Sequence, residues 1–199
     1  MRKRLYVAYG SNLNLEQMKH RCPTAKLIGT GVVNDYELQF KGFPSSAYAT
    51  ISPKAGASVP VGIWELGWMD EKYLDRYEGY PSHYFKKDIP VQMDNGEEVK
   101  GMVYIMNQKM QFGLPSGHYY QVVHQGYRDC GLDTHVLNEA VKASTGGYYE
   151  NLVKDQEQQQ GIRVPDEEYE DEEESYVDDE MEEEDFEDED FDYSDGMHL

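Results

Sequence analysis

Two short segments of the sequence contain residues whose types and spacing could support binding or catalysis. The first is Tyr9-Gly10-Ser11-Asn12, where an apolar run of strand character stops and a helical pattern follows. Such a turn points several backbone N–H groups at one place, and the start of the helix adds partial positive charge. The turn is therefore suited to hold a carboxylate or a phosphate, although the same pattern also serves as a plain connection. It matches neither the phosphate-binding glycine motifs nor a serine nucleophile motif.

The second segment is Tyr77-Glu78-Gly79-Tyr80-Pro81, at the end of a short helical pattern. Glu78 faces the negative end of the helix dipole, which disfavours its ionised form. Desolvation by neighbouring aromatic rings would raise its pKa further, toward that of a base useful near neutral pH. The candidate rings are Tyr77, Tyr80, Tyr84, Trp64 and Trp68. Two alternatives remain: Glu78 is an exposed helix-end acid, or Asp75 is the functional carboxylate.

Patterns elsewhere predict the elements that position these segments. Alternating or apolar runs predict strands over residues 4–9, 25–42, 46–53, 59–69, 84–94 and 97–107. Asp94-Asn95-Gly96 predicts a hairpin between the last two strands. Helices are predicted after an Asn12 or Asn14 cap to about residue 21, after an Asp70 cap over 71–79, after Pro115 to about 130, and over 133–143.

This order of elements predicts an α+β fold. We expect five or six mostly antiparallel strands that curl toward a barrel, with short helices between and after them. The weak alternation of residues 59–69 indicates a strand buried on both faces. No alternating strand–helix rhythm is present, which argues against a doubly wound parallel sheet.

The charge is distributed very unevenly along the chain. All 18 Lys and Arg and 18 of the 39 Asp and Glu precede residue 166, so the formal charge of −21 belongs to residues 166–199. We predict a folded domain over residues 1–155 and a disordered acidic tail over 156–199. Such a tail is repelled by nucleic acid and by anionic membranes. It is either a solvating tail or a binding segment for a basic protein partner.

The remaining signals are mostly exclusions. Cys22 and Cys130 form no disulfide framework or zinc motif, and the six histidines show no paired metal-ligand spacing. The apolar run near the N-terminus is too short for a signal peptide, and no stretch reaches the roughly 20 apolar residues that a membrane span needs. We therefore expect a cytoplasmic protein, and these patterns predict no metal site.

Three motifs, in this order, resemble the γ-glutamylcyclotransferase-like family, which includes AIG2-like proteins and γ-glutamylamine cyclotransferases. They are Tyr9-Gly10-Ser11-Asn12-Leu13, then Tyr77-Glu78-Gly79-Tyr80-Pro81 with Tyr84, then Pro115-Ser116 with Tyr119 and Gly126. The resemblance covers roughly residues 4–146 and leaves the acidic tail out. It implies a small mixed, mostly antiparallel β-barrel with flanking helices.

The resemblance also implies roles for individual residues. The backbone of Tyr9, Gly10, Ser11 and Asn12 would bind the γ-glutamyl group of a small-molecule substrate, and Glu78 would be the catalytic base. The reaction would release 5-oxoproline and a free amine, without a cofactor. Further residues that match the family pattern are Tyr84 and Tyr119, which would lie at the site, although both could equally fill the aromatic core.

A function of a different class also fits the sequence. The barrel could be a non-catalytic binding module whose acidic tail captures a basic protein. The sequence leaves the departing amine and the oligomeric state open.

Overall fold

The computed structural model describes residues 4–43, 46–107 and 109–160. The chain divides into two units, Met1–Arg163 and Val164–Leu199, and every described residue belongs to the first. The predicted acidic tail from residue 161 onward lies outside the described residues.

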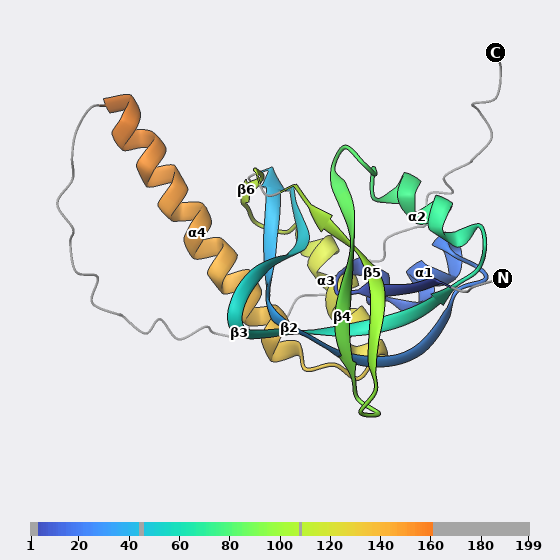
Figure 1. The fold of residues 1–199 in the computed structure, drawn as a ribbon. Coiled ribbons are helices and arrows are strands. Elements are labelled where there is room, and N and C mark those ends of the chain that lie inside the picture. The colour runs from blue at the N-terminus through green and yellow to red at the C-terminus, as the bar shows by residue number, and fades with distance from the viewer. Residues whose placement is uncertain (1–3, 44–45, 108, 161–199) are drawn as a thin grey trace, which may run out of the picture. The chain divides into compact units, whose positions relative to one another are not determined.

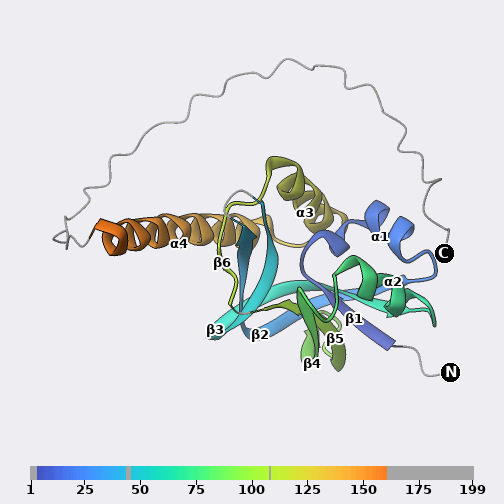
Figure 2. The same ribbon diagram turned by 90° about the horizontal axis from the view of Figure 1, so that it is seen from above.

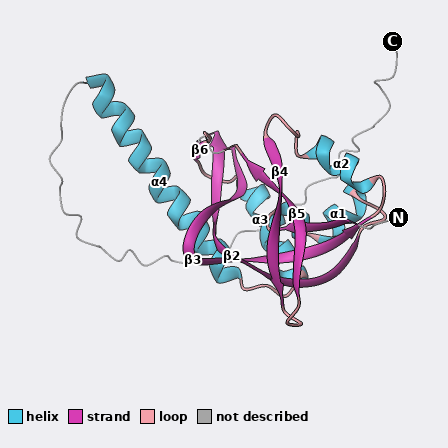
Figure 3. Cartoon of the chain, in the orientation of Figure 1, coloured by secondary structure: helices cyan, strands magenta, loops and turns pink. Residues whose placement is uncertain are grey.

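Within the described residues, one six-stranded sheet contains a closed five-stranded barrel (Figures 1 and 3). The strands are β1 (Arg4–Ala8), β2 (Lys26–Phe43), β3 (Ser46–Leu66), β4 (Tyr84–Met93), β5 (Glu98–Met106) and β6 (Gln111–Phe112). The barrel order is β3-β1-β5-β4-β2, and the β2–β3 pairing closes the ring, while β6 extends the sheet at β2. All pairings are antiparallel except the parallel pairing of β1 with β5. The predicted small, mixed, mostly antiparallel barrel is confirmed.

Four α-helices flank the barrel in the part of the chain that the structure describes. They are α1 (Leu15–Arg21), α2 (Asp70–Tyr77), α3 (Gly117–Asp129) and α4 (Thr134–Gln160), and a 3₁₀ turn, η1 (Ser11–Leu13), links β1 to α1. Asn14 caps α1, because its side chain accepts a hydrogen bond from the amide of Gln17. Figure 2 shows α1 and α3 on the same side of the strands, where α3 contacts η1.

The hydrophobic core joins the barrel to these helices. Val7 of β1, Ile63 of β3, Leu74 of α2 and Tyr127 of α3 are all buried in it. Four consecutive residues of β3, Val61 to Trp64, are buried, which confirms that this segment is covered on both faces. The predicted hairpin is also confirmed, since β4 and β5 pair across Asp94-Asn95-Gly96.

The structure differs from the predicted strands at Pro53. The sequence predicts that one strand ends there and that another begins at residue 59, whereas β3 is continuous from Ser46 to Leu66. Pro53 pairs with Tyr36 directly beside a register shift in β2, where Asp35 has a φ of 60°. The irregular pairing accommodates a residue that has no N–H to donate.

Two helix predictions also need correction. Met69, not Asp70, is the N-cap of α2, while the Asp70 carboxylate accepts hydrogen bonds from Gly67 N and Thr24 Oγ1. The last helix runs to Gln160 instead of stopping near residue 143, so the predicted domain boundary at 155 falls inside α4. Gly147 lies inside α4 and does not end it, and a Cβ there would lie 2.6 Å from Cδ2 of Phe112. The glycine instead allows α4 to approach β6.

Candidate active site

The opening turn projects from the end of β1. Leu13 N donates to Gly10 O at 2.9 Å and Asn14 N donates to Ser11 O at 3.2 Å, so the turn's own hydrogen bonds begin at Leu13. The preceding amides, those of Gly10, Ser11 and Asn12, are not used by the 3₁₀ turn. A Cβ on Gly10 would lie 3.1 Å from Cβ of Ala49, so a larger residue here would push against the neighbouring strand.

Glu78 is brought to this turn from a distant part of the sequence. It follows the last residue of α2, and its amide donates to Leu74 O at 2.8 Å. Its Oε1 atom accepts a hydrogen bond of 2.8 Å from Nδ2 of Asn12, and the same nitrogen donates to the Tyr6 hydroxyl at 2.7 Å. The two segments singled out in the sequence therefore meet through one amide group.

A small pocket lies where these two segments meet. Its volume of about 30 Å³ is enough for one or two water-sized groups. Tyr84 donates to Ala49 O at 3.1 Å, and the Tyr119 hydroxyl accepts from Ala49 N at 3.2 Å, so these two tyrosines fix the strand that forms one wall. The lining residues are Tyr6, Tyr9, Gly10, Ser11, Asn12, Ala49, Glu78, Tyr84, Tyr104 and Tyr119. They include all seven residues that the sequence nominates for catalysis or substrate binding.

The electrostatics of the pocket favour a protonated Glu78. Burial raises the pKa of Glu78 to about 7, against the smaller opposing effects of the Asn12 hydrogen bond and the Arg21 charge. The pKa values of Tyr6, Tyr9, Tyr84, Tyr104 and Tyr119 are also raised, chiefly by burial and further by the charge of Glu78. These hydroxyls therefore stay protonated near neutral pH, and each can donate a hydrogen bond.

The rings that desolvate Glu78 are only partly those expected. Trp68 is 79% exposed and Tyr80 is 43% exposed, and neither they nor Trp64 line the pocket. The pocket walls instead come from Tyr6 on β1 and Tyr104 on β5, together with the predicted Tyr84. Because Tyr6 and Tyr104 meet only through strand pairing, no local sequence signal identifies these two rings.

Arg21 is a further residue of the site that the sequence pattern does not single out. Its Nη1 donates to Asn12 Oδ1 at 2.7 Å and to Ser11 Oγ at 3.2 Å, and its guanidinium carbon lies 3.8 Å from the centre of the Tyr77 ring. Because Oδ1 of Asn12 accepts from Arg21, the amide nitrogen must face Glu78. Arg21 thus orients the group that contacts the carboxylate.

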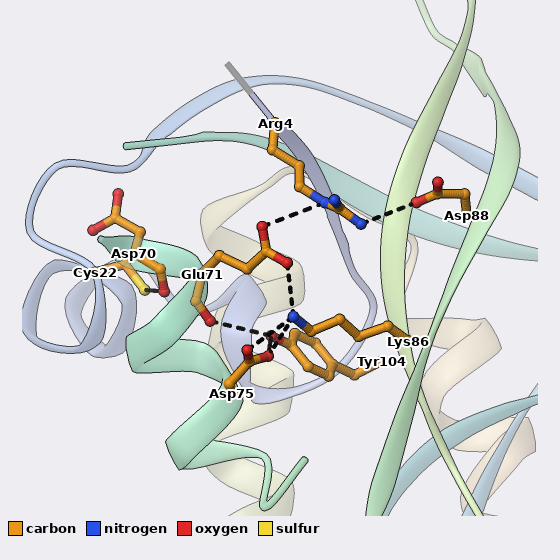
Figure 4. Close-up of polar contacts among 8 residues, drawn as sticks. All are labelled: Arg4, Cys22, Asp70, Glu71, Asp75, Lys86, Asp88 and Tyr104. Carbon is orange, nitrogen blue, oxygen red and sulfur yellow. Dashed lines mark hydrogen bonds and ion pairs between the residues drawn. The ribbon is translucent and has the colours of Figure 1, made fainter. Parts of the chain in front are cut away.

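A second polar network fixes α2 to the barrel (Figure 4). Nζ of Lys86 on β4 lies 2.7 Å from both Glu71 Oε1 and Asp75 Oδ1. The Tyr104 hydroxyl donates to Asp75 Oδ1 at 2.6 Å, and the backbone oxygen of the same tyrosine accepts from Tyr9 at 2.6 Å. Asp75 is therefore held in an ion pair and does not line the pocket, which argues against it as the functional carboxylate.

Other sequence expectations concern metals, cysteines and membranes. Within the described ranges, His, Cys, Asp and Glu do not gather in groups of three or more that could hold a metal ion. Cys22 and Cys130 are both free thiols. No helix among the described residues combines the length and apolar character needed to cross a membrane.

A closed barrel with a carboxyl of raised pKa in a small polar pocket has the features expected of an enzyme that uses acid–base chemistry. The chain belongs to the γ-glutamyl cyclotransferase, AIG2-like family, whose model matches residues 6–127. The resemblance drawn from the three sequence motifs is thereby confirmed.

Individual relatives agree with this assignment. The chain is 29% identical to the γ-glutamylcyclotransferase of Mus musculus over 160 residues, 76% of this chain and 84% of the relative. It is 30% identical to the γ-glutamylcyclotransferase of Bos taurus over 136 residues, 64% of this chain and 72% of the relative. A solved γ-glutamyl cyclotransferase structure has a TM-score of 0.64 and 26% identity, covering 70% of this chain and 86% of that one. Family membership supports an enzymatic role.

Proposed function

We propose that the chain converts a γ-glutamyl amide of a primary amine, or a γ-glutamyl amino acid, to 5-oxoproline and the free amine or amino acid. The substrate's α-amine nitrogen attacks its own γ-carbonyl carbon, a C–N bond forms in a five-membered ring, and the bond to the departing nitrogen breaks. The α-nitrogen loses two protons, one from the ammonium before attack and one after the new C–N bond forms, and both end on the departing nitrogen, which leaves as an ammonium. Ring closure is intramolecular, so much of the entropic barrier is removed by binding the substrate in a folded conformation.

Glu78 is the base and then the acid in this scheme. The contact between Glu78 and Asn12 of the opening turn is the observation that carries the proposal. A base with a pKa of about 7 takes a proton from an α-ammonium of pKa roughly 8 at a cost of only about 1.4 kcal/mol. A solvent-exposed glutamate of pKa roughly 4.3 would face a cost of about 5 kcal/mol. The raised pKa thus brings the proton transfer close to balance.

The opening turn binds the reacting group. The amides of Gly10, Ser11 and Asn12 are candidate donors to the γ-carbonyl oxygen as negative charge develops on it, or to the substrate's α-carboxylate. The hydroxyls of Tyr6 and Tyr119 accept hydrogen bonds from Asn12 Nδ2 and Ala49 N, so each keeps its own proton to donate at the pocket wall, whereas the Tyr84 proton is donated to Ala49 O. Because this polar pocket is small, it suits the compact reacting end of a ligand.

The test is release of 5-oxoproline, measured by mass spectrometry, from γ-glutamyl amides and γ-glutamyl amino acids. Glu78→Gln keeps an acceptor for Asn12 and removes the base, and we expect it to lower kcat by a factor of about 100 or more. Glu16→Gln, an exposed carboxylate on α1, is the matched control and should behave as wild type. Wild-type activity in Glu78→Gln would refute the assignment of the base.

A further inference from the structure

A second, larger cavity opens directly beside the small pocket. Its volume of about 610 Å³ is in the range of small-molecule binding sites. The two cavities share Ser11, Glu78, Tyr84 and Tyr119, so a ligand can occupy both at once. We call the larger cavity the outer groove. It is lined by Ser11, Gly42, Phe43, Ser46, Tyr48, Tyr77, Glu78, Gly79, His83, Tyr84, Met106, Met110 and Tyr119.

The outer groove differs in chemistry from the small pocket. Aromatic rings and thioethers dominate it, and three of the rings are exposed although they are large: Phe43 is 70%, Tyr48 is 45% and Tyr77 is 49% exposed. Exposed aromatic rings gathered around one cavity indicate a surface that binds an apolar group. Methionine side chains adapt to the shape of such a group.

Two of these rings are held in place by neighbouring side chains. Tyr48 packs edge-to-face against Tyr119, with 4.9 Å between ring centres. Tyr77 is covered by the guanidinium of Arg21, 3.8 Å from its ring centre. Little side-chain entropy is then lost when a ligand contacts them, so the groove is prepared for an apolar ligand.

The outer groove is poorly suited to a negatively charged ligand. Among its described lining residues, Glu78 is the only acid, and His83 is the only side chain able to carry positive charge. Arg21 lies beyond this lining, and its guanidinium already donates to Ser11, Asn12 and Gln17. A carboxylate placed in the groove would lose water without gaining an arginine or lysine partner, which is unfavourable.

We propose that the outer groove binds the departing amine, and that this chain prefers γ-glutamyl amides of uncharged, apolar or aromatic primary amines. This inference rests on the proposed cyclotransferase function and narrows its substrate class. The reacting γ-carbonyl enters the small pocket, while the amine's substituent extends past Glu78 toward Phe43 and Tyr48. γ-Glutamyl amino acids are poorer substrates, because the departing amine then carries a carboxylate.

Three synthetic substrates test the preference with the full chain. They are γ-glutamyl-methylamide, γ-glutamyl-(2-phenylethyl)amide and γ-glutamyl-phenylalanine, and the last two differ only by the carboxylate. We expect kcat/KM for the phenylethylamide to exceed each of the other two by a factor of about ten or more. Release of 5-oxoproline from the methylamide at a rate equal to that from the phenylethylamide would overturn the inference and leave the cyclotransferase function standing.

The other outcomes are equally decisive. Equal kcat/KM for γ-glutamyl-phenylalanine and the phenylethylamide would overturn the exclusion of carboxylates, and with it the proposed preference. If none of the three compounds releases 5-oxoproline, the proposed function itself fails. The two failures are therefore distinguishable.

Variants of the lining residues test whether the outer groove causes the preference for an aromatic amine. Phe43→Ala and Tyr48→Ala should each lower the ratio of kcat/KM for the phenylethylamide to that for the methylamide by about fivefold to tenfold. Trp68→Ala removes an aromatic ring that is 79% exposed and lines neither cavity, and it should leave this ratio unchanged. A ratio that stays at the wild-type value in both groove variants would overturn the assignment of the groove.

Discussion

Asn12 connects three chemically different groups through one amide. Its oxygen accepts from Arg21, and its nitrogen donates to Tyr6 and to Glu78. The pKa of Glu78 is thus the balance between burial, which raises it, and the Asn12 hydrogen bond and Arg21 charge, which lower it. Removing either the Asn12 hydrogen bond or the Arg21 charge should therefore raise the pKa of Glu78.

This balance predicts how the pH dependence of kcat/KM responds to changes at Arg21. Glu78 must be ionised to act as a base, so activity should fall as the pH drops through about 7. In Arg21→Gln the lost positive charge raises the pKa of Glu78, and the acidic limb should move to higher pH. Arg21→Lys keeps the charge and loses the planar guanidinium. The acidic limb of its pH profile should therefore stay near the wild-type position, while the plateau value of kcat/KM falls.

The control for this pH series is Lys19→Gln, which removes a positive charge from an exposed position of the same helix. Its pH profile of 5-oxoproline release should match that of wild type. If the acidic limb moves equally in Lys19→Gln and Arg21→Gln, then Arg21 affects the pKa of Glu78 only through the net charge of the protein and not through its position in the site.

The raised pKa of Glu78 also predicts a pH-dependent stability difference. Folding raises this pKa from 4.5 to about 7, so the proton stabilises the fold fully below pH 4.5, and this stabilisation is lost as the pH rises through about 7. Glu78→Gln has no such loss. It should be more stable than wild type at pH 8, by at most about 3 kcal/mol, with a difference that shrinks toward pH 5.

Urea unfolding at pH 5, 6.5 and 8 measures this stability difference. The same variant should have its kcat lowered by a factor of about 100 or more, as expected where a functional carboxyl is kept at a cost in stability. A Glu78→Gln protein that is less stable than wild type at pH 8 would contradict burial as the cause of the raised pKa.

At the residue scale, the sequence predicts the parts of the site that have local signals. Tyr9 to Asn12 end a strand, and Glu78 ends a helix before a glycine, so both stand out in the sequence and both line the pocket. Tyr6 and Tyr104 do not stand out, because they meet only through the parallel pairing of β1 with β5. The sequence does not single out Arg21 for a similar reason: its hydrogen bonds to Ser11 and Asn12 depend on the contact between α1 and η1 in the folded protein.

At the element scale, the position of η1 depends on its contact with α3. Gly126 sits where the helix crosses the turn, and a Cβ there would lie 2.5 Å from Asn14 N and 2.7 Å from the carbonyl carbon of Leu13. These are backbone atoms, so the clash can be relieved only by moving the helix or the turn. Since Ser11 and Asn12 belong to the same turn, such a movement reaches the site.

Gly126→Ala should therefore destabilise the fold by about 1–3 kcal/mol and lower kcat/KM, although alanine is the better helix former. Gly117→Ala, in the first turn of the same helix, is the matched control, because a Cβ at that position meets no heavy atom within 4 Å. Urea unfolding and 5-oxoproline release measure both effects. Equal behaviour of the two variants would show that the α3–η1 contact is not tight.

Elements were predictable from the sequence where the signal is local. The Asn-Gly hairpin, the Asn14 cap and the helix after Pro115 all agree with the structure. The continuity of β3 through Pro53 and the length of α4 were not predictable, since the register shift in β2 and the approach to Phe112 arise only in the folded protein. Proline and glycine each normally indicate an interruption, and tertiary pairing overrides that tendency here.

At the scale of the whole molecule, charge is separated along the chain. Residues 1–165 are formally neutral, and all 21 excess negative charges lie in residues 166–199. Any ligand of the pocket therefore approaches a protein whose residues 166–199 carry a large negative charge. The γ-glutamyl amide of an uncharged amine is a zwitterion with no net charge, whereas a γ-glutamyl amino acid carries one net negative charge.

This difference predicts that salt changes kcat/KM for one class of substrate and not for the other. The charge of residues 166–199 should repel γ-glutamyl-phenylalanine at low ionic strength, where the Debye length is about 30 Å, and repel it much less at 0.15 M, where it is about 8 Å. Its kcat/KM should thus rise about twofold to fivefold between these conditions, while that of the phenylethylamide stays level. A chain that ends at Val164 should show no rise with either substrate, because it lacks all 21 of those acids. An equal rise in kcat/KM for γ-glutamyl-phenylalanine in the full and shortened chains would place the repulsion in residues 1–164, and the acidic segment would then have no part in selecting substrates.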